Sequence, residues 1–143
     1  MERRWAIAAN TVRAMGVVLL VVAAIHLVVT PVLANALAHS VSDEQWQFLR
    51  APTLINHIVV GVLLVPIGVT LIALTGQLRT GARWAWWLAM VHALAVVSLP
   101  IVLVAVVPLA LFEARPFLIA SVLVTLVAVT LPVVLLWARP TSR

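Results

Sequence analysis

Four long apolar runs organise the chain, and short charged segments separate them. The runs without a charged residue occupy residues 14 to 42, 51 to 78, 84 to 112 and 116 to 138. Each exceeds the roughly 20 residues that a helix needs to cross the hydrocarbon core of a bilayer. Because the connections are too short to be domains, consecutive helices must be antiparallel neighbours. The pattern predicts an all-α fold, in which residues 1–143 form a single integral membrane four-helix up-down bundle. The expected spans lie at about 14–38, 53–76, 84–110 and 116–138.

The first connection carries a helix signal of its own. The stretch "SVSDEQWQFL" places Ser42 in front of a helix and Gln45 at its third position, which is the arrangement of a capping box. Trp46 and Phe48 can then dip into lipid. We expect a short amphipathic segment at about 42–50 on the outer surface.

Composition strengthens the membrane interpretation and removes several chemistries. Of the 143 residues, 65% are hydrophobic and 9% are charged, and the mean hydropathy is +1.23. The sequence has no cysteine, lysine or tyrosine, which excludes thiolate metal sites, iron–sulfur clusters, Schiff bases and phenolic acid–base roles. The net charge of +5 comes from scattered arginines rather than a basic stripe, so no nucleic-acid partner is expected.

The distribution of arginine predicts the orientation. Seven arginines lie at the N-terminus, in the second connection and at the C-terminus, whereas the first and third connections hold only Arg50 and Arg115. Because basic residues collect on the cytoplasmic side, both termini should be cytoplasmic. The bias towards alanine, valine, leucine and arginine is typical of GC-rich bacteria, and we expect the bacterial cytoplasmic (inner) membrane. Five tryptophans should then anchor the cytoplasmic interface: Trp5, Trp84, Trp86, Trp87 and Trp137.

Three histidines are the only ionisable residues inside the apolar spans: His26, His57 and His92. Ionisable groups at such depth are candidate functional residues. At a rise of 1.5 Å per residue, His92, His26 and His57 lie about 7, 16 and 24 Å from the cytoplasmic boundary. The sequence therefore predicts a stagger of roughly 8–9 Å between successive histidines.

A b-type haem is the cofactor that this pattern favours. We expect His57 as the first axial ligand and His26 as the second, with His92 as a further candidate. Gly61 offers a small surface against which a porphyrin can lie, although helix packing explains Gly61 and Gly68 equally well. Two axial ligands must lie at nearly one depth, so the haem hypothesis requires about one helical turn of slip from the nominal positions.

Two other uses of the histidines are open. The staggered residues can line a polar path through a small transporter or channel-like bundle, since histidine relays protons near neutral pH. At the outer mouth, His39 and His57, with Asp43 and Glu44 nearby, have the nitrogen and oxygen atoms of a copper or zinc site.

The sequence thus predicts a small membrane subunit and not an enzyme in isolation. Its expected partners are the lipid bilayer and either other membrane subunits or further copies of itself. With haem it would serve electron transfer or quinone chemistry. Without a cofactor it would be a purely structural or assembly subunit, in which the histidines bond to backbone carbonyls across helix contacts.

Overall fold

The computed structural model describes residues 2–106 and 115–140. These residues form five helices and no strand: α1 (Glu2–Ser40), α2 (Asp43–Ala73), α3 (Thr75–Arg79), α4 (Arg83–Val106) and α5 (Arg115–Trp137). Three helices are long and apolar enough to cross a membrane, through Glu2–Ser40, Asp43–Ala73 and Arg83–Val102, and α5 adds the shorter apolar helix Ser121–Trp137. The all-helical fold is confirmed, and three of these helices have the length and apolar composition of membrane spans. The predicted end of the third span at residues 107–110, and Arg143, lie outside the described residues.

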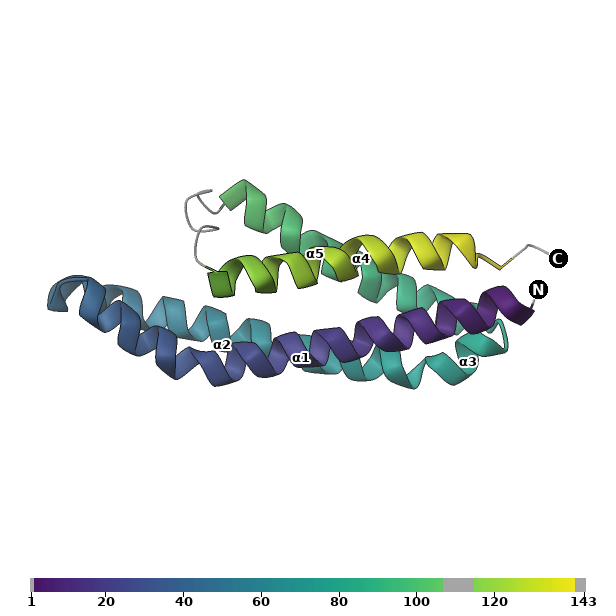
Figure 1. Ribbon diagram of the computed structural model, residues 1–143, viewed down its shortest axis with the longest axis horizontal. Helices are drawn as coiled ribbons and strands as arrows, with labels where there is room; N and C mark the ends of the chain where they lie inside the picture. Colours follow the sequence, from purple (N-terminus) through teal and green to yellow (C-terminus); the bar gives the residue numbers. More distant parts are fainter. Residues whose placement is uncertain (1, 107–114, 141–143) are drawn as a thin grey trace.

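The helices pack as two antiparallel pairs (Figure 1). One pair is α1 with α2, and the other is α4 with α5, which lies over the half of α1 nearest the N-terminus. Both termini and α3 lie at the same end of the molecule. Two bonds hold this end together: Arg79 Nη2 donates to Asn10 Oδ1 at 2.7 Å, and Arg4 Nη2 donates to the Arg139 carbonyl at 3.4 Å. The three arginine-rich segments therefore share one end of the bundle.

The first connection is shorter than expected, because α2 begins directly after Ser42. The predicted capping box is confirmed: Gln45 N donates to Ser42 Oγ, and Ser42 N donates to Gln45 Oε1. The helix then continues through Pro52 without a break to Ala73. A proline removes one backbone hydrogen bond, and one lost bond does not end a helix whose next residues must satisfy their own backbone in lipid. The amphipathic segment and the second span are thus one helix.

The chain reverses after α3 in a Schellman motif centred on Gly81. Gly81 has φ +72°, its N–H bonds to the Leu78 carbonyl at 3.0 Å, and the Ala82 N–H bonds to the Gln77 carbonyl at 3.1 Å. A side chain at this φ would be strained. The Trp5 indole covers the turn, with its Nε1 atom 3.4 Å from where a Gly81 Cβ would stand. The start of α1 is thereby packed against the second connection.

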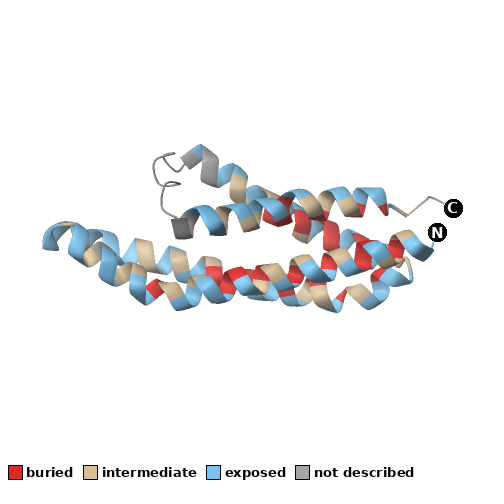
Figure 2. Cartoon of the chain, in the orientation of Figure 1, coloured by how far each residue is buried: buried red, intermediate tan, exposed pale blue. Residues whose placement is uncertain are grey.

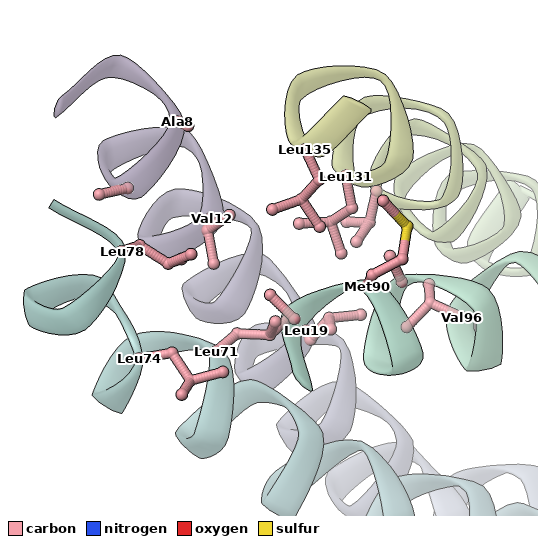
Figure 3. Close-up of a cluster of buried hydrophobic side chains, with 14 of the residues drawn as sticks. Ala8, Val12, Leu19, Leu71, Leu74, Leu78, Met90, Val96, Leu131 and Leu135 are labelled. Atoms are coloured by element: carbon pink, nitrogen blue, oxygen red, sulfur yellow. The ribbon is translucent and has the colours of Figure 1, made fainter. Parts of the chain in front are cut away.

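Buried apolar residues concentrate between the two helix pairs, towards the end that carries the termini (Figure 2). Figure 3 shows Val12 and Leu19 of α1 facing Leu71 of α2, with Leu131 and Leu135 of α5 on the opposite side. The first three turns of α1, which precede the predicted span, belong to this core because small residues such as Ala8 let α1 approach its neighbours closely.

The tryptophan prediction is wrong for two of its five residues. Trp5 and Trp86 are only 6% and 5% exposed, whereas Trp84, Trp87 and Trp137 are more than half exposed. The buried pair belongs to the core because the faces of α1 and α4 that carry Trp5 and Trp86 pack against neighbouring helices. Trp86 also has a polar role: its Nε1–H donates to the Leu135 carbonyl at 2.7 Å, in the last turn of α5, where carbonyls lack helical partners.

Replacing Trp86 with phenylalanine should lower the free energy of unfolding by about 2–3 kcal/mol, since the Leu135 carbonyl loses its donor and the smaller phenyl ring leaves a void in the core. Trp86 and Leu135 are both buried, so water does not replace the lost donor. Unfolding in detergent titrated with a denaturing surfactant measures it. The exposed Trp87→Phe is the matched control, and an equal loss in both variants would contradict the role assigned to the Trp86 bond.

Candidate functional site

Two of the three intramembrane histidines meet between α1 and α2. The rings of His26 and His57 are stacked, with centroids 4.6 Å apart and an angle of 29° between their planes. The predicted stagger of roughly 8–9 Å between them is absent. The difference arises because the depth estimate placed each helix separately in the bilayer, whereas contacts between the helices set their register. We refer to His26 and His57 as the histidine pair.

Thr30 joins the two members of the pair. It is the one buried polar side chain of the described residues, at 8% exposure. Its Oγ1 donates to the His26 carbonyl at 2.6 Å and lies 2.8 Å from His57 Nδ1. A hydroxyl has a single proton, and a carbonyl only accepts. His57 Nδ1 must therefore carry its own proton and donate to Thr30.

His26 adopts the same tautomer for a different reason. Its Nδ1 lies 3.0 Å from the Val22 carbonyl, one turn earlier in α1, and so must be the donor. Both rings, when neutral, then present Nε2 as an unprotonated acceptor. Histidines that bind metals are commonly oriented in this way, with one ring nitrogen donating to an oxygen and the other free. The pair thus has two oriented nitrogen ligands, and both rings are partly exposed.

Glycines fix the register that brings the pair together. A Cβ on Gly16 would stand 2.8 Å from the Gly68 carbonyl oxygen, and a Cβ on Gly68 would stand 2.8 Å from the Gly16 carbonyl oxygen. We call this reciprocal approach the glycine contact. At Gly61 a Cβ would meet Leu27 at 3.0 Å and His26 Cβ at 3.2 Å. Gly61 therefore packs against α1 and has no open surface for a porphyrin in this arrangement.

The two remaining histidines bond to their own helices. His92 Nδ1 lies 2.8 Å from the Leu88 carbonyl in α4, and His39 Nδ1 lies 2.7 Å from the Asn35 carbonyl in α1. His92 has no ring contact with the histidine pair among the described residues. The three histidines therefore do not form an evenly spaced polar path, because His26 and His57 lie at one depth.

The proposed outer metal site is not assembled. His39 follows His26 by 13 residues in one helix, which corresponds to about 20 Å. Since His57 is stacked on His26, His39 and His57 are separated by a similar distance. Over residues 2–106 and 115–140, no group of three or more histidine, aspartate or glutamate side chains is placed to hold a metal ion.

The stacked rings do not fit a haem between them as they stand. Two axial nitrogens bound at about 2.0 Å would lie about 4 Å apart on opposite sides of the metal, pointing at each other. Here the rings lie face to face, and Leu27 covers Gly61. The arrangement does place the two candidate ligands at a common depth. The helix boundaries expected from the sequence had placed them roughly 8–9 Å apart in depth.

Thr30 was not among the predicted site residues. The signal was present in "HLVVT", since a residue four positions after His26 lies one turn further on the same helix face. A hydroxyl there can reach the His26 carbonyl, which is a common bond of threonine in a helix. The contact with His57 could not be read from this spacing, because it depends on the register between two helices.

Comparison with protein-family models, curated proteins and solved structures finds no match to this chain. The geometry and chemistry of the histidine pair and of the surrounding bundle are therefore the guide to function.

Proposed function

We propose that the chain is a four-span protein of the bacterial cytoplasmic membrane, with both termini in the cytoplasm, that serves as a small subunit of a larger membrane complex or homo-oligomer. The arginine-rich segments share one end of the bundle, which supports placing that end in the cytoplasm. As the fourth span, α5 has 23 residues and a length of about 35 Å, enough for the hydrocarbon core.

The observation that carries the subunit role is the way the polar groups of the interior are used. Thr30 and the histidine pair bond to one another and to backbone carbonyls at a helix contact. Such bonds hold transmembrane helices together. The outward faces of α2 and α4 are apolar over most of their length, with Ile55, Val62, Leu94 and Ile101 all more than half exposed. The apolar outer faces can contact lipid or a partner helix, whereas the polar groups of the interior stabilise the contact between α1 and α2.

Isolation of the full chain in mild detergent tests the subunit role. We expect a particle larger than the 15.4 kDa chain, either several copies or a complex with other membrane proteins. Light scattering coupled to chromatography, corrected for bound detergent, gives the protein mass. A C-terminal reporter active only in the cytoplasm tests the orientation. A monomer that brings no other protein with it from native membranes would contradict the proposal.

Haem b is the second candidate, favoured by the shared depth of His26 and His57. It requires the two rings to turn apart so that their Nε2 atoms face the iron from opposite sides. The expected result is a Soret band with α and β bands on reduction, lost in both His26→Ala and His57→Ala and retained in the matched variant His92→Ala. A colourless protein after expression with ample haem would reject this candidate while leaving the subunit role untouched.

A further inference from the structure

Asn56 is an exposed polar residue within the apolar helix α2. Its carboxamide makes no hydrogen bond within the part of the chain that the structure describes, whereas its neighbour His57 bonds to Thr30 of α1. In water an exposed carboxamide is solvated. In hydrocarbon it has no such partner, and an unpaired polar group is costly there. The depth of Asn56 therefore decides whether it needs a partner.

Two arginines bracket the depth of Asn56. Arg50 precedes it by six residues, which correspond to about 9 Å along α2. On the other side, His57 is stacked on His26, which follows Arg13 by 13 residues, or about 20 Å along α1. The two distances together match the roughly 30 Å of a hydrocarbon core. In the four-span orientation proposed above, on which this inference rests, Asn56 therefore lies inside the hydrocarbon.

Asn56 belongs to an exposed stripe of α2 with the spacing of a coiled coil, which we call the seam. Its members follow one another at alternating steps of four and three residues, and all are exposed: Pro52, Asn56, Val59, Leu63 and Pro66. Gly61 and Gly68, which pack against α1, lie on a different face of α2. Transmembrane helices commonly pair along a seam of this kind. The seam is thus a packing surface that no described helix covers, and Asn56 is its polar member.

A carboxamide is complementary to a second carboxamide, because it has both N–H donors and a carbonyl acceptor. Two copies inserted in the same direction have parallel α2 helices, and a twofold axis along the membrane normal places each seam residue opposite its own equivalent. We propose that the chain forms a homodimer through the seam, in which the Asn56 carboxamides of two copies bond reciprocally. A single asparagine at such a position fixes the register and the number of helices. By symmetry, a second copy has the matching group at the matching depth.

Cysteine cross-linking of the full chain in native membranes tests the seam, since the sequence has no cysteine of its own. Leu63→Cys places a thiol on the seam, and the matched control Val65→Cys places one on nearly the opposite side of α2. Both native side chains are exposed. A membrane-permeant oxidant should join Leu63→Cys into a species of twice the chain mass, and Val65→Cys much less. Equal cross-linking of the two variants, or none at Leu63→Cys, would refute the seam.

Dilution of the purified full-length protein in detergent tests the carboxamide, with light scattering as the measure of protein mass. Asn56→Leu keeps the approximate shape, loses both bonds, and should raise the dimer dissociation constant about tenfold. Asn56→Gln keeps a carboxamide and should raise it less. The matched control is Asn35→Leu, at an exposed asparagine near the end of α1, which should leave the constant within about twofold. Equal effects of Asn56→Leu and Asn35→Leu would refute the reciprocal bond.

The composition of the particle separates this inference from the proposed subunit role. A native chain that stays monomeric at all concentrations, yet brings another membrane protein with it from native membranes, would overturn the homodimer and leave the subunit role intact. A product that joins Leu63→Cys to a different protein would have the same meaning. A dimer that dissociates in Asn56→Leu, while its helix content by circular dichroism is unchanged, would support the proposed contact.

Discussion

Replacing Gly68 with alanine should lower the free energy of unfolding by about 1–3 kcal/mol, the range of overpacked substitutions. The new Cβ would stand 2.8 Å from the Gly16 carbonyl oxygen and 2.9 Å from Leu20 Cγ. The Leu20 side chain can turn away, but the carbonyl belongs to the backbone of α1. Relief therefore requires α1 and α2 to move apart, which also weakens the packing of their neighbours. Surfactant-induced unfolding in detergent or bicelles measures the loss.

Two variants make this result specific to the glycine contact. At Gly76 nothing lies within 4 Å of the position a Cβ would take, so Gly76→Ala should stabilise the protein by up to about 1 kcal/mol through helix propensity. Gly16→Ala should behave like Gly68→Ala, because the two carbonyls approach each other's Cα reciprocally. The double variant should lose less than the sum, since one separation of the helices relieves both clashes. Additive losses would mean that the two glycines act independently.

The existence and type of the long helices could be derived from the sequence. Runs of 23 to 29 uncharged residues have few stable alternatives in lipid, and the cap at Ser42 and Gln45 followed from local hydrogen bonding. Helix ends were less predictable. Glu2 to Arg13 look polar enough to lie outside a span, yet they continue α1, because one face bearing Trp5, Ala8 and Val12 packs into the core.

The positions of His26 and His57 show that depths estimated separately for each helix were inaccurate. Each residue was placed from the nearest charged end of its own run, with an error of about one turn. The relative shift of α1 and α2 is decided by the close approach of Gly16 to Gly68, which no single run reveals. Trp86 was misplaced for a similar reason. In the sequence, a tryptophan beside arginines resembles an interface anchor. In the structure, its indole instead donates a hydrogen bond to the Leu135 carbonyl of another helix.

Replacing Thr30 with valine should lower the free energy of unfolding by about 1–2 kcal/mol, the cost of leaving a polar group without its partner at a helix contact. Valine keeps the shape of threonine, so packing is nearly preserved, but His57 Nδ1–H loses its acceptor. The His26 carbonyl loses only its bond from the Thr30 hydroxyl, since it keeps the backbone bond of helix α1. Most of the loss therefore measures the connection between α1 and α2.

The tautomer of His57 gives a readout that packing alone would not change. With Thr30 in place, nitrogen NMR of labelled imidazole should show His57 protonated on Nδ1, and Thr30→Val should shift it towards the Nε2–H form that prevails when neither nitrogen is held. Thr30→Ser retains the hydroxyl and should retain the Nδ1–H form, although the lost methyl costs some stability. In His57→Ala the further change Thr30→Val should cost much less than in the native chain, because the acceptor then has no donor to serve. If Thr30→Val and Thr30→Ser destabilise equally and leave the His57 tautomer unchanged, the hydroxyl does not link the helices, and the stacking of the two rings must arise from packing alone.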